Sequence, residues 1–251
     1  MAIKNNKSLG QHWLKNRLIL DDIADFAVVN GVDDCLEIGP GLGTLTSSLL
    51  KRFDKVTAVE FDANLAHNLP NSFPGKNLEV INADFLKFDL NKMPEKYVAA
   101  GNIPYYITSP IIEKLLRAER QPAKIVLLIQ KEVAERIAAS DGHQSLLSLF
   151  VQNRADVELG PIVKREEFTP PPKVDSEIII LTPKEQVIKE DVFVLIKKGF
   201  NAPRKKLIAN LAGLKSKDDL KQIFAKLDLD ENARPADLSL QDWERLFESM
   251  L

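Results

Sequence analysis

The feature that most constrains the fold is an alternation of short aliphatic runs with helical patterns over the first two-thirds of the chain. The aliphatic runs predict strands at 35–38, 56–59, 78–81, 97–100, 125–129 and 177–182, with a weaker one near Val157. The helical patterns between them fall at 18–29, 42–52, 111–117, 131–139 and 145–153. Strands and helices at this spacing predict an α/β domain, a Rossmann-like, mostly parallel seven-stranded sheet covered on both faces.

The pattern changes after Leu181. The segment 182–186 is typical of a linker, and no strand is expected beyond it. Helices are expected at 191–200, 204–213, 217–227 and 240–251, with Ser216 and Ser239 as N-caps of the last two. The sequence therefore predicts two domains, a ligand-binding domain over 1–182 and a small all-α domain over 183–251.

Composition limits the class of protein. A chain of 251 residues with 45% hydrophobic and 28% charged residues has enough apolar side chains for a sizeable core. A single cysteine, Cys35, allows no internal disulfide, and with three scattered histidines it argues against a metal site. The aliphatic runs are too short to span a bilayer, and Met1–Lys7 has no apolar stretch behind it. We expect a cytoplasmic protein without a membrane segment.

Charge is distributed unevenly. The net charge is −2, yet residues 1–20 contain four basic residues and no acid, and residues 197–217 contain seven basic residues and no acid. Screening confines each exposed charge to a reach of about 8–10 Å, so a local basic face can bind phosphates whatever the total charge. A lysine-rich helix is also compatible with a plain solvated surface. The candidate RNA-binding residues are Lys197, Lys198, Arg204, Lys205 and Lys206.

A glycine-rich loop, Glu37-Ile-Gly39-Pro-Gly41-Leu-Gly43, follows the first expected strand. Glycines allow sharp turns and close approach of the backbone to a ligand. Glu60 ends the second strand, where a carboxylate can accept both hydroxyls of a ribose. The spacing differs from that of dinucleotide enzymes and fits a ligand without a pyrophosphate, such as S-adenosylmethionine. Many glycine-rich turns, however, only connect secondary structure elements.

Asp84 follows the third expected strand. Its carboxylate is placed to accept a hydrogen bond from an adenine amine. The alternative is an ordinary turn or N-cap residue, which is the more common role of an isolated aspartate.

The segment Asn102-Ile-Pro104-Tyr105 ends the fourth expected strand. An exocyclic amine attacks a sulfonium methyl only when its lone pair is localised, and two acceptors aimed at its N–H bonds favour that geometry. The amide oxygen of Asn102 and the carbonyl of Pro104 can supply them. Tyr105 offers a flat face on which an extruded base can stack. The alternative is a proline-containing strand exit with half-buried tyrosines.

Together these motifs resemble the KsgA-type ribosomal RNA adenine dimethyltransferases over nearly the whole chain. The family resemblance includes Leu9–Leu14 at the N-terminus, Phe168–Ser176 before the last strand and the basic segment at Arg204. It implies S-adenosylmethionine as methyl donor and no metal. It also implies dimethylation of two adjacent adenosines near the 3′ end of small-subunit ribosomal RNA, with the small ribosomal subunit as partner, a role in ribosome biogenesis and a monomeric enzyme.

The resemblance also assigns residues. It implies cofactor contacts from His12, Leu14, Gly39, Gly41, Glu60, Asp84 and Asn102, and catalytic roles for Asn102, Pro104, Tyr105 and Phe168. Phe168 would be a second aromatic surface against the flipped adenine. The chain departs from the family pattern where His12 stands for an asparagine, Trp13 for a phenylalanine and Tyr106 for an asparagine, and where Ala202-Pro203 interrupts the usual polar run before Arg204.

Three other functions compete with this interpretation. The erythromycin-resistance methyltransferases share most of the motifs and act on large-subunit RNA. An RNA-binding ribosome assembly factor with secondary catalysis would need the basic residues but not Asn102. A nicotinamide-dependent oxidoreductase would use a related fold, and the missing pyrophosphate glycine spacing argues against it.

Overall fold

A computed structural model describes residues 11–139 and 143–251. Two compact units divide the chain. The first comprises the described residues up to Ala134 together with Asp156–Pro183, and the second comprises the described residues of Glu135–Ala155 together with Lys184–Leu251. The expected boundary at 182/183 lies one residue from the break after Pro183. The sequence did not indicate that the segment 135–155 would pack with the C-terminal helices.

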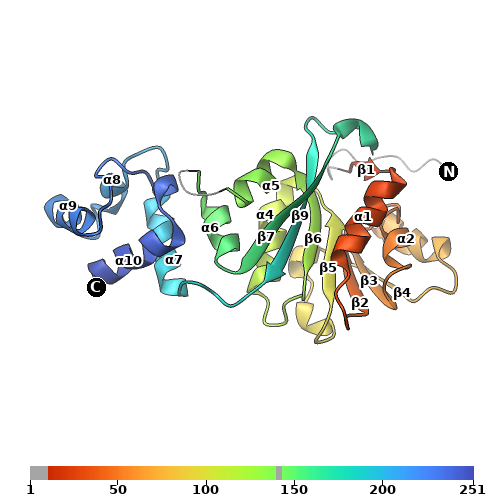
Figure 1. Ribbon diagram of the computed structural model, residues 1–251. Helices are drawn as coiled ribbons and strands as arrows, with labels where there is room; N and C mark the ends of the chain where they lie inside the picture. The colour runs from red at the N-terminus through yellow and green to blue at the C-terminus, as the bar shows by residue number, and fades with distance from the viewer. Residues whose placement is uncertain (1–10, 140–142) are drawn as a thin grey trace. The chain divides into compact units, whose positions relative to one another are not determined.

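The first unit is built on a seven-stranded sheet of order β4-β3-β2-β5-β6-β9-β7 (Figure 1). Neighbours from β4 to β6 are parallel, and β9 runs antiparallel to β6. The strands are β2 (Asp34–Ile38), β3 (Lys55–Glu60), β4 (Leu78–Asn82), β5 (Val98–Asn102), β6 (Ile125–Gln130), β7 (Ala155–Val163) and β9 (Ser176–Pro183). The predicted fold class, a mostly parallel Rossmann-like sheet followed by a helical region, is confirmed.

A second, two-stranded sheet joins distant parts of this unit. Strand β1 (Trp13–Leu14) pairs antiparallel with β8 (Phe168–Thr169), and Leu14 lies opposite Phe168. Two-residue strands carry no periodic pattern, so the sequence did not indicate them. The pairing brings the N-terminal segment to the start of the loop that leads into β9.

Polar side chains cap some of the helices of the first unit, among them α1 and α3. Asn16 caps α1 by accepting from the backbone N–H of Leu18 over 3.1 Å, and α1 contacts β5 and β6. The α-helices here are α1 (Arg17–Ala27), α2 (Thr46–Leu49), α3 (Ala63–Asn68), α4 (Thr108–Arg117) and α5 (Lys131–Ile137). The 3₁₀ helices are η2 (Leu69–Ser72), η3 (Phe85–Lys87), η4 (Leu90–Lys92), η5 (Tyr105–Ile107) and η6 (Arg165–Glu167).

Helix α2 is shorter than the helix expected over 42–52. Gly41 and Gly43 have positive φ angles of 57° and 80°, a left-handed conformation that does not continue a right-handed helix. The glycine loop therefore extends further than its sequence pattern indicated, and the α-helix begins only at Thr46.

The central strand β5 contains the small residues Ala99, Ala100 and Gly101. In β5, an added Cβ on Gly101 would lie 2.8 Å from the backbone oxygen of Ile38. No real side chain tolerates that distance, so glycine lets β5 approach β2 closely. The carboxyl-terminal ends of β2 and β5 therefore lie side by side, and the residues after both strands line the same cavity.

The second unit is helical. Its elements are α6 (Leu146–Gln152), α7 (Glu190–Gly199), α8 (Leu207–Leu211), α9 (Lys217–Lys226), η7 (Pro235–Asp237) and α10 (Leu240–Met250). Ser216 and Ser239 cap α9 and α10 as predicted. The buried guanidinium of Arg154 stacks on the rings of Phe150 and Phe193 and pairs with Glu190. Among the described residues, no helix is both long and apolar enough to cross a bilayer.

Candidate functional site

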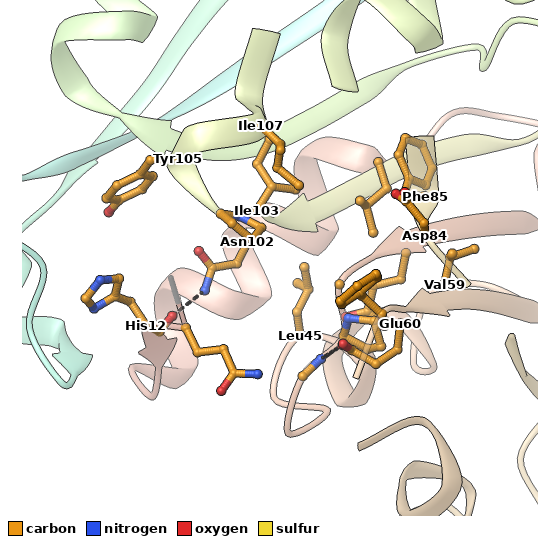
Figure 2. Close-up of a pocket in the computed structure, with 18 of the residues that line it drawn as sticks. His12, Leu45, Val59, Glu60, Asp84, Phe85, Asn102, Ile103, Tyr105 and Ile107 are labelled. Atoms are coloured by element: carbon orange, nitrogen blue, oxygen red, sulfur yellow. Dashed lines mark hydrogen bonds between the residues drawn. The ribbon is translucent and has the colours of Figure 1, made fainter. Parts of the chain in front are cut away.

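A cavity of about 310 Å³ opens beyond the carboxyl ends of the parallel strands (Figure 2). The ends of β2, β3 and β5, the turn after β4 and the segment Gln11–Trp13 line it. Ligands in open parallel sheets bind at this edge, because the strand order reverses there and leaves a crevice. The volume lies at the small end of the range for small-molecule sites.

A hydrogen bond connects the glycine loop to the carboxylate of Glu60 at the end of β3. The backbone N–H of Gly41 donates to Oε2 of Glu60 over 3.0 Å, and the N–H of Asp62 donates to Oε1 over 2.8 Å. Burial raises the pKa of Glu60, and the two backbone donors oppose that rise. Each carboxylate oxygen keeps a second lone pair for a ligand. Both Gly39 and Gly41, which the sequence singled out with Glu60, line the cavity.

A second acid, Glu37, lies beneath the glycine loop and is 1% exposed. The hydroxyl of Thr46 donates to its Oε2 over 2.6 Å, whereas Oε1 makes no hydrogen bond with any residue that the structure describes. Burial raises the pKa of Glu37 to about 8, and the neighbouring charge of Glu60 adds to the rise. Sequence reasoning gave Glu37 no role, although a glutamate inside an apolar strand next to a glycine loop was a usable signal.

Asp84 lines the cavity, and it also caps a turn. Its Oδ1 accepts from the backbone N–H of Leu86 over 3.0 Å at the start of η3. Both roles that the sequence left open are therefore compatible with its position, because Oδ2 is not needed for the cap. An adenine-binding role stays a prediction.

Asn102 ends β5 and faces the cavity (Figure 2). Its Nδ2 donates to the backbone carbonyl of His12 over 3.0 Å. Because a carbonyl oxygen only accepts, this hydrogen bond assigns the nitrogen of the Asn102 amide to the side of His12 and the oxygen to the other side. The side-chain oxygen is left to accept from a ligand, which is the role predicted for it.

Pro104 and Tyr105 follow directly. The carbonyl of Pro104 accepts from the N–H of Ile107 over 3.2 Å, so one of its two lone pairs remains for a substrate amine. The hydroxyl of Tyr105 shares a 2.7 Å hydrogen bond with Oγ of Ser176 at the start of β9. Burial raises the pKa of Tyr105. Tyr105 is thus held in place by its backbone in η5 and by its hydroxyl group.

His12 lies across from Tyr105. The two rings are nearly parallel, with an interplanar angle of 18° and centroids 6.2 Å apart. Nδ1 of His12 is 2.7 Å from the carbonyl oxygen of Pro170. His12 lines the cavity, so the structure brings this predicted residue to the site.

Leu14 and Phe168 are the predicted site residues of the first unit that do not line the cavity. Leu14 is fully buried and Phe168 is 2% exposed, and both belong to the core cluster beneath the sheet. They lie opposite each other in the β1–β8 pair. Both side chains are therefore on the same face of the pair, and this apolar face is the one buried against the core. Phe168 therefore offers no free face to a base here. Its stacking role, like the cofactor contact of Leu14, stays a prediction that this position does not support.

The predicted RNA-binding residues lie in the second unit. Lys197 and Lys198 occupy the last turn of α7, while Arg204 and Lys205 precede α8 and Lys206 is its N-cap. All five are exposed, and none of them makes an ion pair with another described residue. The amide of Asn210 donates to the carbonyls of Gly199 and Ala202, over 2.6 and 3.0 Å, and holds the loop between the two helices.

The charged residues that line the cavity restrict the charge of the ligand that can bind there. Among the described residues that line it, Glu60 and Asp84 are carboxylates, Glu37 is a buried carboxyl group whose pKa is raised to about 8, and none is a lysine or an arginine. A pyrophosphate would meet repulsion there, whereas a cationic ligand would be attracted. In the same part of the chain, no group of three or more His, Cys, Asp or Glu side chains is placed to hold a metal ion.

Comparison with known families matches residues 2–251 to the family described as "Ribosomal RNA adenine dimethylase". The chain belongs to this family of methyltransferases. A "Ribosomal RNA small subunit methyltransferase A" from Acaryochloris marina is 39% identical, covering 97% of this chain and 96% of that protein. A protein of the same name from a Nostoc species is 40% identical, covering 97% of both chains.

Solved structures of related methyltransferases share the fold of this adenine dimethylase. A dimethyladenosine transferase from Plasmodium falciparum superposes with a TM-score of 0.81 at 32% identity, covering 95% of this chain and 98% of that one. The 23S rRNA methyltransferase ErmE superposes with a TM-score of 0.77 at 30% identity, covering 95% and 99%.

Proposed function

We propose that this adenine dimethylase transfers methyl groups from S-adenosylmethionine to the exocyclic N6 amines of two adjacent adenosines near the 3′ end of small-subunit ribosomal RNA. The observation that carries the proposal is the orientation of Asn102, whose amide oxygen faces the cavity because its nitrogen is bound to His12. Full-length relatives named as small-subunit methyltransferases support the choice of substrate.

The cavity fits the methyl donor. When bound, S-adenosylmethionine supplies an electrophilic methyl group on a positively charged sulfur. Glu60 offers two carboxylate oxygens to the ribose hydroxyls, and Asp84 offers one to the adenine amine. Gly39 and Gly41 allow the backbone to approach without a β-carbon in the way. The unpartnered oxygen of the buried Glu37 gives the cavity a further polar group.

The chain prepares the amine for attack. Asn102 and Pro104 hold two acceptors at the end of β5, and an amine whose N–H bonds point at both is held in its pyramidal, nucleophilic form. Tyr105 presents its ring to the base and is kept in place by Ser176. No strong base is required, because the ammonium product releases its proton readily to water.

The five exposed cations of the second unit are proposed to bind the phosphate backbone of the RNA. They cluster at the loop between α7 and α8, and an unpaired surface cation releases counterions from RNA when it binds. A monomer that acts in the cytoplasm on the small ribosomal subunit remains part of the proposal.

The test is methylation of defined particles. Purified protein with tritiated S-adenosylmethionine and unmethylated small subunits should label two adjacent adenosines near the 3′ end of the RNA, located by mass spectrometry of fragments. Labelling of large-subunit RNA alone would contradict the proposal and support the activity stated for ErmE, which the structural likeness to that enzyme makes the second candidate.

The remaining alternatives predict other outcomes. A ribosome assembly factor with secondary catalysis would bind the particles and leave them unlabelled. A nicotinamide-dependent enzyme would bind NAD in calorimetry, which the carboxylates of Glu60 and Asp84 in the cavity oppose.

A further inference from the structure

We infer that Lys114 is a positioning residue for the adenine end of the cofactor site, acting through the turn that carries Asp84, an inference that rests on the proposed function. Lys114 lies on α4, is half-buried and is not among the residues that line the cavity. Its Nζ donates to the backbone carbonyl of Leu86 over 2.9 Å. Leu86 does line the cavity, two positions after Asp84. One charged side chain thus connects α4 to the cavity wall.

The backbone of Leu86 is held on both sides. Its N–H donates to Oδ1 of Asp84 over 3.0 Å, and its carbonyl accepts from Lys114. Asp84 is the N-cap of η3, which is only three residues long. A 3₁₀ turn has weak hydrogen-bond geometry of its own, so a contact from a neighbouring helix helps to fix it. The direction of Oδ2 of Asp84, the oxygen that the cap leaves for an adenine amine, therefore depends on Lys114.

The charge of Lys114 adds to the hydrogen bond. Its Nζ lies 5.8 Å from the centroid of the buried ring of Phe85, the residue between Asp84 and Leu86. Burial lowers the pKa of Lys114, and the carboxylates of Asp89 and Asp84 oppose that fall. Both acids are therefore close enough to interact electrostatically with the ammonium. That interaction favours the ionised form of Asp84, which accepts a hydrogen bond and does not donate one.

The turn that Lys114 contacts lies away from the site proposed for the target base. Figure 2 shows Asp84 and Tyr105 on opposite sides of the cavity. Replacing Lys114 should therefore change how the adenine of the cofactor is bound. It leaves in place the hydrogen bond that orients Asn102.

Two ligands isolate the contact of Asp84 with an amine. S-adenosylhomocysteine carries the exocyclic amine of adenine, and S-inosylhomocysteine carries a carbonyl oxygen at the same position. The ratio of their affinities, measured by calorimetry with the full chain, therefore reports that contact. Lys114→Met removes the charge and the donor but keeps an apolar stem near Phe85, and Lys114→Arg keeps both. Lys87 is exposed on the same turn and outside the cavity, so Lys87→Met is the matched control.

We expect the parent to prefer S-adenosylhomocysteine by at least about tenfold, the effect of a hydrogen bond to a charged group. Lys114→Met should reduce that preference by about 3- to 10-fold and leave the affinity for S-inosylhomocysteine close to that of the parent. Lys114→Arg and Lys87→Met should both keep the preference of the parent.

An equal loss of affinity for both ligands in Lys114→Met assigns Lys114 a general structural role and overturns the inference. An unchanged preference overturns it as well. If the methionine variant does not fold, Lys114→Gln provides the same comparison. A parent that binds the two ligands equally contradicts the role of Asp84, and the inference with it. A parent that prefers S-adenosylhomocysteine but labels no ribosomal RNA contradicts the proposed function alone.

Discussion

The side-chain nitrogen of Asn102 donates to the backbone carbonyl of His12 over 3.0 Å, between positions ninety residues apart. His12 is bound in turn to Pro170 through its ring and precedes the strand that pairs with β8. The end of β5, the N-terminal segment and the loop before β9 are therefore connected by hydrogen bonds at the cavity. The orientation of the Asn102 oxygen depends on that connection.

Removing the carboxylate of Glu60 should weaken cofactor binding. Glu60→Ala removes both acceptors proposed for the ribose and the tie to the N–H of Gly41. Hydrogen bonds to a charged group contribute about 1.5–3 kcal/mol each, so we expect the affinity for S-adenosylhomocysteine to fall at least about tenfold in calorimetry. Glu79→Ala, at an exposed carboxylate of β4 outside the cavity, is the control. Equal affinity in the Glu60 variant and the parent contradicts the assignment.

Glu37 should make stability depend on pH. Its folded-state pKa of about 8 lies above the ordinary value of 4.5, so the folded chain holds a proton that the unfolded chain releases. This contribution is fully present below about pH 4.5 and is lost as the pH rises through 8, at up to about 1.4 kcal/mol per pH unit. Glu37→Gln does not titrate. Urea denaturation at pH 5, 6, 7 and 8 should therefore show the variant gaining free energy of unfolding relative to the parent. A difference that is independent of pH contradicts the predicted titration.

The exposed cations near α8 should set the salt dependence of RNA binding. Arg204, Lys205 and Lys206 replaced together by alanine should weaken binding and reduce the slope of log K against log salt concentration by about 2–3, since each phosphate contact contributes about 0.7–0.9. Lys76, Lys92 and Lys96 are exposed on the first unit, and their triple alanine variant controls for net charge. An equal change of slope in both triple variants assigns the effect to total charge.

Phe168 should prove important for stability. Because the ring is 2% exposed within the core cluster, Phe168→Ala is expected to lower the free energy of unfolding by about 3–5 kcal/mol. Phe168→Leu keeps most of the apolar volume and should methylate at a rate close to that of the parent. If the leucine variant is stably folded and loses more than about tenfold in kcat/KM, then Phe168 stacks on the base as the family resemblance implied.

The sheet and the acceptors at its edge were predictable from the sequence because they depend on local patterns. Aliphatic runs indicate strands, and in a parallel sheet the residues after each strand gather at one edge, which brings Glu60, Asp84 and Asn102 to one cavity. The C-terminal caps at Ser216 and Ser239 were equally local.

The parts that the sequence did not reveal depend on tertiary contacts. The two-residue pairing of β1 with β8 has no periodicity, and it decides that Leu14 and Phe168 point into the core. The packing of segment 135–155 with the C-terminal helices also rests on long-range contacts, such as the Arg154–Glu190 pair. The near-parallel position of His12 against Tyr105 follows from the same pairing.

The most direct test of the account is methyl transfer by Asn102→Ala. The variant loses the acceptor at the cavity, and loss of one such preorganised group costs about 10²–10³ in rate. We expect single-turnover transfer to unmethylated small subunits to fall by at least that factor, while binding of the particles stays close to that of the parent. A variant that methylates the two adenosines as fast as the parent would contradict the central role of Asn102.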